Sequence, residues 1–335
     1  YFITGGTGFI GTHLTNLLHE VHPEAKIYNL DIIEPGTPLP TVKNYKPALR
    51  KGEEHAATFI YCDVRQPIEL EKVDITPDDV IFNFAAVHRT PGHPDPAYFE
   101  TNIRGAENVC AFAERHGIRK IVFTSSIAPY GAAEELKEET TLPMPNTPYG
   151  ISKLVAEKIH QTWQAGGEGR QLTIVRPGVV FGRGENGNFT RLYWGIRGHK
   201  FMYPGRKDTI KACIYVKELV RFMLYRLEHH DSGVELYNCC YEPAYTIEHI
   251  VESMKRVTNM KVKVPFMPGW LIMTAAGIAG ALGSPMGICP ARVRKLQIST
   301  NICGKKLSAS GYRFHYTFEE ALADWYKDNG NLYLQ

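Results

Sequence analysis

The chain has 335 residues, of which 44% are hydrophobic, enough to bury a large core in one domain or two. Its 38 basic and 35 acidic residues give a formal charge of +3, which excludes the strongly basic surface of a typical nucleic-acid-binding protein. The seven cysteines include no Cys-x-x-Cys pair and no zinc-like spacing, so we expect reduced thiols, no metal site and a cytoplasmic location.

Strand-like and helix-like patterns alternate along the first half of the chain. The apolar runs that predict strands are residues 1–4, 26–30, 58–62, 80–84, 120–124 and 172–176. The periodic segments that predict helices between them are residues 11–20, 96–116 and 149–165. This alternation predicts an α/β fold, a doubly wound parallel (Rossmann) sheet with helices on both faces. Because residue 1 already lies in a predicted strand, we expect the natural chain to begin earlier.

The regular pattern weakens after residue 182, where glycines, scattered aromatic residues and short apolar segments follow. We therefore predict a dinucleotide-binding Rossmann domain over residues 1–182. Residues 209–227 are expected to return to this domain as a strand and a helix. Residues 183–335 are predicted to form mainly a smaller, interleaved substrate-binding region.

Residues 264–291 contain no charged residue and no histidine, and on length alone they could suggest a membrane span. Four prolines and five glycines interrupt this segment, so no apolar stretch of about 20 residues remains. We therefore predict no span. The favoured interpretation is a helix that covers the substrate cleft, and contact with a membrane interface is the open alternative.

A glycine-rich turn follows the first predicted strand. Gly5, Gly8 and Gly11 have G-x-x-G-x-x-G spacing, and a helix that begins near Gly8 presents free backbone N–H groups to a pyrophosphate. Phe9 and Ile10 belong to the same turn and are included among the predicted cofactor contacts. The alternative is a tight strand-to-helix turn with no ligand.

Asp31 follows the second predicted strand, 20 residues after Gly11, where a carboxylate can accept hydrogen bonds from a ribose 2′-hydroxyl. It would repel a 2′-phosphate, and no Lys or Arg follows closely, so we predict NAD(H) rather than NADP(H). Further cofactor contacts are predicted after the third and fourth strands, at Asp63, Val64, Ala85 and Ala86. His88 is a candidate for the substrate pocket, with a surface-loop position as the alternative.

Tyr149 and Lys153 are one helical turn apart, so both side chains lie on one helix face. A tyrosine, with a reference pKa of about 10, needs a stabilised anion to act as a base at neutral pH. The Lys153 ammonium can supply that charge and also bind a ribose hydroxyl. Thr124 ends the fifth predicted strand and, with Tyr149 and Lys153, is a predicted cofactor contact. Ser126 follows that strand and would hold the substrate oxygen. The set predicts hydride transfer at a sugar-like carbon, with Tyr149 exchanging the hydroxyl proton.

These motifs resemble the extended short-chain dehydrogenase/reductase family, particularly its NAD-dependent epimerase/dehydratase group that acts on nucleotide sugars. The resemblance spans nearly the whole chain and is carried by residues 5–11, 31, 63–64, 85–88, 101–105, 124–126, 149–153 and 176–182. It implies that Ser126, Tyr149 and Lys153 are catalytic. It also implies that Pro177 and Val179 approach the nicotinamide, that Asn102 helps to order the site, and that residues 98–116 and 149–165 build a homodimer.

Dehydratases of this group carry an Asp-Glu pair directly after the catalytic Ser or Thr, whereas Ile127 and Ala128 follow Ser126 here. We therefore predict a 4-epimerase of a nucleotide sugar, favouring a UDP-sugar. Alternatives left open are an NADH-dependent 4-keto-sugar reductase, a 3β-hydroxysteroid or other lipid-alcohol dehydrogenase, and a non-catalytic NAD-sensing protein. A weaker similarity links residues 186–191 and 210–216 to enzymes of surface-polysaccharide sugar pathways. Candidate contacts to the nucleotide end are Asn188, Phe189, Arg191 and Tyr215.

Overall fold

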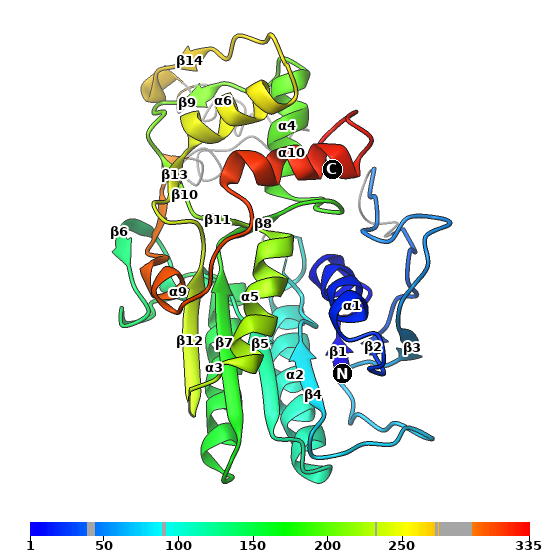
Figure 1. The fold of residues 1–335 in the computed structure, drawn as a ribbon. Coiled ribbons are helices and arrows are strands. Elements are labelled where there is room, and N and C mark those ends of the chain that lie inside the picture. Colours follow the sequence, from blue (N-terminus) through cyan, green and yellow to red (C-terminus); the bar gives the residue numbers. More distant parts are fainter. Residues whose placement is uncertain (39–43, 89–91, 232, 272–273, 275–296) are drawn as a thin grey trace.

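The computed structural model describes residues 1–38, 44–88, 92–231, 233–271, 274 and 297–335 (Figure 1). Its central sheet has seven strands, all parallel, in the order β3-β2-β1-β4-β5-β7-β12. They are β1 (Phe2–Thr4), β2 (Tyr28–Asp31), β3 (Thr58–Tyr61), β4 (Val80–Asn83), β5 (Lys120–Thr124), β7 (Gln171–Pro177) and β12 (Val234–Cys239). The strand order reverses between β1 and β4, which is the place where open α/β sheets bind ligands.

Helices cover both faces of this sheet (Figure 1). They are α1 (Phe9–Val21) and α5 (Val216–Glu228) on one face, and α2 (Asp95–Arg115) and α3 (Pro148–Ala165) on the other. Successive side chains of a strand point to opposite faces, so Phe2 joins the core cluster of α2 and α3 while Ile3 joins that of α1 and α5. The predicted doubly wound α/β fold is confirmed.

A smaller layer covers the carboxyl ends of the sheet strands (Figure 1). Its helices and helical turns are η1 (Ala128–Tyr130), α4 (Asn188–Arg197), α6 (Ile247–Val257), α9 (Lys305–Ala309) and α10 (Phe318–Asp328). Its strands are β6 (Ala133–Lys137), β8 (Val179–Phe181), β9 (Tyr203–Pro204), β10 (Ile210–Lys211), β11 (Cys213–Tyr215), β13 (Tyr245–Thr246), β14 (Phe266–Met267) and β15 (Thr300–Ile302). β13, β10, β15 and β6 form a four-stranded sheet, whereas β11 pairs only with β8 and β14 only with β9 among the described residues. This layer has its own core, in which Trp325 is fully buried.

The six predicted strands and three predicted helices of the first half are present, with ends shifted by at most two residues. One strand of the central sheet was not predicted: β12 adds to its edge beside β7. The division into two domains stays a prediction. Among the described residues, none of the helices combines the length and apolar character needed to cross a bilayer. Most of the helix predicted over residues 264–291 lies outside the described residues.

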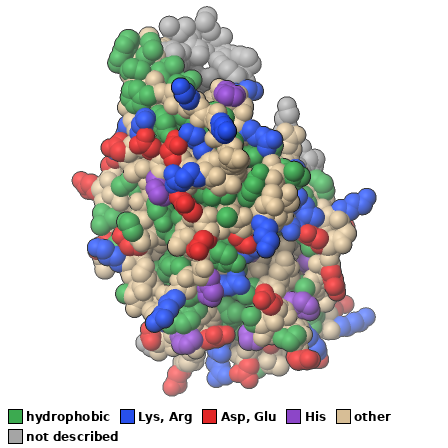
Figure 2. All heavy atoms as spheres, turned by 45° about the horizontal axis from the view of Figure 1, so that its top comes forward, with side chains coloured by type: hydrophobic (Ala, Val, Ile, Leu, Met, Phe, Trp, Pro, Cys, Tyr) green, Lys and Arg blue, Asp and Glu red, His purple; other side chains and the backbone are tan. Residues whose placement is uncertain are grey.

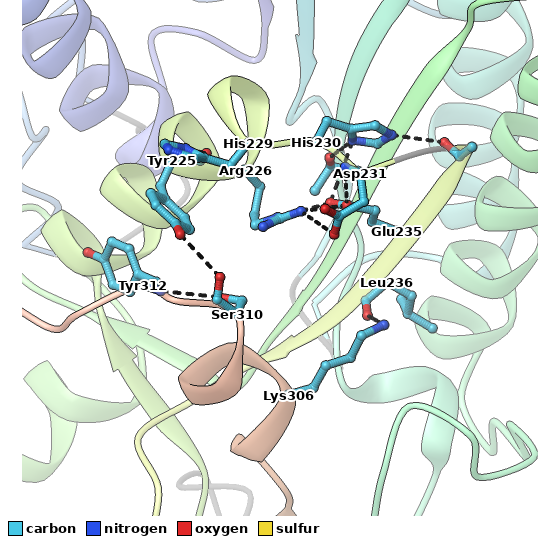
Figure 3. Close-up of polar contacts among 12 residues, drawn as sticks. Tyr225, Arg226, His229, His230, Asp231, Glu235, Leu236, Lys306, Ser310 and Tyr312 are labelled. Atoms are coloured by element: carbon cyan, nitrogen blue, oxygen red, sulfur yellow. Dashed lines mark hydrogen bonds and ion pairs between the residues drawn. The ribbon is translucent and has the colours of Figure 1, made fainter.

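Charged contacts hold the C-terminal half of the chain against the sheet. Figure 2 shows acidic and basic side chains interspersed over one face, as the small net charge implies. In the interior, Arg226 of α5 donates to both carboxylate oxygens of Glu235 on β12, at 3.0 and 2.6 Å (Figure 3). Lys306 of α9 donates to the carbonyl oxygen of Leu236 at 2.8 Å. These contacts tie α5 and α9 to β12 at the edge of the central sheet.

Candidate active site

The glycine turn between β1 and α1 lies at the reversal point of the sheet. Gly5 has φ +68°, and a Cβ there would lie 2.8 Å from the backbone nitrogen of Ala85. A Cβ on Gly11 would lie 2.5 Å from the carbonyl oxygen of Gly6. Glycine at these positions therefore allows β1, the loop after β4 and the start of α1 to pack closely.

The start of α1 offers an anion-binding position. Gly8 is the N-cap residue, no described side chain caps the helix, and its first turn contains no acidic residue. The N–H groups of this turn and the positive end of the helix dipole suit a diphosphate. A Cβ on Gly8 would meet only the Gly5 carbonyl oxygen, at 3.2 Å, so there is room for a ligand above the turn. Phe9 and Ile10 are half-buried at the same place. The turn thus fits the diphosphate of NAD.

Asp31 ends β2 beside this turn, and Thr7 holds its carboxylate. The backbone nitrogen and hydroxyl of Thr7 donate to Asp31 Oδ2 at 3.2 and 2.8 Å, while the Ile32 nitrogen donates to Oδ1 at 2.8 Å. Burial raises the pKa of Asp31, and these hydrogen bonds act against that rise. Thr7 was not among the predicted site residues, although a hydroxyl inside the glycine turn could have suggested it.

The Asp31→Ala variant is expected to lose the preference for NAD over NADP. Removing an ionised acceptor of a ribose hydroxyl should weaken NAD binding about tenfold or more, whereas NADP binding should not weaken. Isothermal titration calorimetry with each cofactor measures both affinities. The control is Asp63→Ala. In the wild-type chain the Asp63 carboxylate is paired with Arg65 at 2.6 Å, so its removal should not change the preference between the two cofactors. A wild-type preference for NADP, or an unchanged preference in Asp31→Ala, would contradict the role of Asp31.

The other predicted cofactor contacts lie at carboxyl ends of the central strands. Val64 follows β3 and is buried against α2, where a Cβ on Gly105 would lie 3.0 Å from its side chain. Ala85 and Ala86 follow β4 and are half-buried. Pro177 ends β7, and Val179 begins β8. This placement matches the expected edge of the sheet, and their contacts with a cofactor stay a prediction.

Tyr149 projects from the first turn of α3. Thr147 fixes the start of this helix, because its hydroxyl oxygen accepts a hydrogen bond from the Gly150 nitrogen at 3.1 Å. Burial raises the pKa of Tyr149 to about 12, and a polar interaction with Ser126 lowers it. The structure therefore brings together Ser126 and Tyr149, which are 23 residues apart in the sequence.

Lys153, one turn further along α3, is buried at the end of β5. Its Nζ donates to the carbonyl oxygen of Thr124 at 2.7 Å and lies 4.7 Å from the centre of the Phe123 ring. Burial lowers the pKa of Lys153 to about 7, and the charge of Glu157 raises it. The Thr124 hydroxyl is also buried, with no hydrogen-bond partner among the described residues. An unpaired hydroxyl beside an ammonium fits a polar ligand such as the nicotinamide riboside of NAD.

A buried ion pair supports Lys153, and the sequence interpretation missed it. Glu157 lies on α3 and is 1% exposed. Its carboxylate accepts two hydrogen bonds from the Arg176 guanidinium, from Nε at 2.8 Å and from the terminal nitrogen Nη2 at 2.6 Å. Ser125 Oγ donates to the same carboxylate at 2.5 Å. Glu157 follows Lys153 by four residues, as Lys153 follows Tyr149, so the repeated spacing was the available signal.

Asn102 connects the loop after β4 to α3. Its Oδ1 accepts from the Val87 nitrogen at 2.8 Å, and its Nδ2 donates to Ser152 Oγ at 2.9 Å. Ser152 in turn donates to the carbonyl oxygen of Tyr149 at 2.9 Å. These contacts are consistent with the ordering role that the resemblance implies for Asn102. His88 is exposed on the same loop.

Two of the predicted nucleotide contacts lie in the core of the smaller layer. Tyr215 is fully buried and its hydroxyl donates to Asp324 Oδ2 at 2.7 Å. Phe189 is 3% exposed and stacks on Phe181 with ring centres 4.8 Å apart. Packing takes up both aromatic rings, so we remove them from the candidate substrate surface. Asn188 and Arg191 are exposed on α4, where the guanidinium donates to Asn188 Oδ1 at 2.7 Å.

Residues 1–240 match the model of the NAD dependent epimerase/dehydratase family. The chain is 30% identical over 328 residues to the N-acetyl-alpha-D-glucosaminyl-diphospho-ditrans,octacis-undecaprenol 4-epimerase of Escherichia coli O157:H7. This match covers 96% of this chain and 92% of that protein. It is 30% identical over 298 residues to the UDP-glucose 4-epimerase of Lacticaseibacillus casei, with coverages of 79% and 83%. The fold superposes on the UDP-N-acetylglucosamine 4-epimerase from Methanobrevibacter ruminantium M1 with a TM-score of 0.72, at 21% identity over 98% of this chain and 97% of that chain.

Proposed function

Because the chain belongs to the NAD-dependent epimerase/dehydratase family, we propose that it is a nucleotide-sugar 4-epimerase that acts on a UDP-sugar. The observation that carries this proposal is the grouping of Tyr149, Ser126 and buried Lys153 at the carboxyl end of β5. Two relatives at 30% identity are 4-epimerases by name, which supports the same reaction.

In this reaction the side chains position the sugar and move a proton. The glycine turn and Asp31 would hold NAD, which when bound supplies the acceptor and donor of hydride. Ser126 would orient the sugar hydroxyl, and Tyr149 would take its proton and later return it. With a pKa of about 12, Tyr149 is a poor base by itself, so the Lys153 charge is needed to stabilise its anion. Ile127 and Ala128 offer no carboxyl group for water elimination.

The purified protein should convert a UDP-sugar into its C4 epimer with no net formation or consumption of NADH. Chromatography of the sugar products and NADH absorbance measure the two quantities together. Stoichiometric NADH consumption with a 4-keto-sugar would instead identify a reductase. Turnover of a 3β-hydroxysteroid without turnover of UDP-sugars would identify a lipid-alcohol dehydrogenase. NAD binding without any turnover would favour a sensing role, so each of these three results overturns the proposed epimerase.

A second candidate substrate is a sugar joined through a diphosphate to a polyisoprenoid. It is favoured by the Escherichia coli relative, whose name specifies such a substrate and whose match covers 96% of this chain, against 79% for the Lacticaseibacillus casei enzyme. Parallel assays with UDP-N-acetylglucosamine and with its polyprenyl-diphosphate counterpart in detergent separate the two candidates. Epimerisation of the polyprenyl compound alone would replace the UDP-sugar in the proposal.

We further propose that α2 and α3 form a homodimer interface. Ile151 and Val155 of α3 are 40% and 36% exposed, and apolar side chains on an outer helix face suit a self-complementary contact. Light scattering of the purified protein measures the assembly, and a monomer at micromolar concentration would contradict it. The cytoplasmic location stays a prediction.

A further inference from the structure

Three large apolar side chains lie exposed within six residues of one another in the smaller layer. Phe266 is 51% exposed, Trp270 72% and Leu271 41%, and we call these three side chains the apolar surface. Exposed aromatic side chains that gather in this way mark contact sites for other molecules. In Figure 2, hydrophobic side chains gather at the top of the face shown, and in Figure 1 β14 lies at the same end of the molecule.

The backbone beneath this surface is held in place. The Tyr203 nitrogen donates to the carbonyl oxygen of Pro265 and the Gly205 nitrogen to that of Met267, both at 2.9 Å. A Cβ on Gly205 would lie 2.9 Å from the Cα of Gly269, so β9 and the start of the next helical turn are in close contact. The exposure of the apolar surface is therefore a property of an anchored segment.

Uncompensated positive charge flanks the apolar surface. Val262 and Val264 pack against the core, so the alternating residues Lys261 and Lys263 face outward and are exposed. Neither lysine forms an ion pair with a described residue. Acidic residues earlier in the chain do not offset them, because Glu248 is paired with Lys207 and Glu252 with Lys255. Residues 253–318 contain ten Lys and Arg residues and no Asp or Glu.

We propose that the apolar surface and the flanking Lys261 and Lys263 bind the surface of an anionic phospholipid bilayer. Tryptophan and phenylalanine are suited to the headgroup region, where an amphipathic or apolar ring meets water. Lysines beside them are attracted to lipid phosphates. A bilayer is favoured over a protein partner because Lys261 and Lys263, beside the apolar surface, carry one charge sign and pair with no described carboxylate, whereas protein surfaces usually mix both signs.

Docking in this manner would place the smaller layer against the bilayer and the Rossmann sheet away from it (Figure 1). The carboxyl edge of the sheet, with Tyr149 and Ser126, would then lie between the two. Bilayer binding does not depend on which diphosphate carries the sugar, so it can be tested separately from the proposed epimerase activity.

Flotation with vesicles tests the proposal. The full chain should float with phosphatidylcholine vesicles that contain phosphatidylglycerol, and less with phosphatidylcholine alone. Replacing the three apolar side chains together (Phe266→Ser, Trp270→Ser, Leu271→Ser) should reduce partitioning about tenfold or more. The double variant Lys261→Gln, Lys263→Gln should reduce it about 30-fold on phosphatidylglycerol vesicles and little on neutral ones. Matched controls are Leu142→Ser, at a side chain 76% exposed, and Lys51→Gln with Lys72→Gln, at exposed lysines outside this region.

Tryptophan fluorescence gives a second measurement that does not depend on the folding of the triple variant. Vesicles should shift the emission of the wild-type chain to shorter wavelength, and Trp270→Phe should still bind while losing most of that shift. Absence of wild-type binding to phosphatidylglycerol vesicles would overturn the proposal. So would equal binding by the triple variant, or a concentration-dependent dimer that the triple variant abolishes without any effect on lipid binding.

Discussion

The Tyr149→Phe variant is expected to lose turnover by about 10²- to 10⁴-fold while it keeps NAD affinity. Phenylalanine retains the ring and its packing on α3 but cannot take or return a proton. Because Lys153 and Ser126 remain, substrate and cofactor should still bind in the same place. The measurement combines kcat with a UDP-sugar and the Kd of NAD from calorimetry.

The matched control removes a tyrosine hydroxyl far from the site. Tyr225 donates to the carbonyl oxygen of Ser310 at 3.1 Å, on the part of α5 shown in Figure 3. Tyr225→Phe should leave kcat within about twofold, because the loss of one hydrogen bond there changes stability by only about 1 kcal/mol. If Tyr149→Phe kept wild-type turnover, Tyr149 could not be the proton-transfer residue.

The Glu157→Ala variant is expected to lower the free energy of unfolding by about 3–5 kcal/mol. The change leaves the Arg176 guanidinium, 3% exposed, without its carboxylate partner in the interior. The Ser125 hydroxyl would lose its acceptor as well. Urea denaturation measures the change. The control is Glu248→Ala. The Glu248 side chain is 48% exposed, and its pair with Lys207 should contribute less than about 1 kcal/mol to the free energy of unfolding. Equal losses in both variants would contradict a special role for the buried pair.

The milder Glu157→Gln variant tests whether the pair also acts on the reaction. Glu157 raises the pKa of Lys153 against the effect of burial, which lowers it to about 7. Removing the Glu157 charge should lower that pKa further, so Lys153 would lose its proton at a lower pH. The alkaline limb of kcat/KM should therefore move to lower pH. A purely structural role for Glu157 would reduce stability and leave the pH profile unchanged.

The sequence predicted six of the seven strands of the central sheet and the glycine turn because these depend on local patterns. A run of apolar residues followed by closely spaced glycines specifies a strand, a tight turn and a helix start without reference to the rest of the chain. Tyr149 and Lys153 were identifiable for the same reason, since i and i+4 lie on one face of any α-helix. Ser126 required a further step, the rule that carboxyl ends of parallel strands share one edge.

Only the tertiary structure decided which distant side chains meet. Glu157 and Arg176 form a buried pair because α3 packs against β7, and Thr7 holds Asp31 because the first turn lies beside the end of β2. Packing likewise placed Phe189 and Tyr215 in a core, although their sequence positions suggested a substrate surface. Spacing along the chain fixes contacts within one helix or strand. Contacts between elements depend on how all of their faces pack together, and a single sequence pattern does not encode that arrangement.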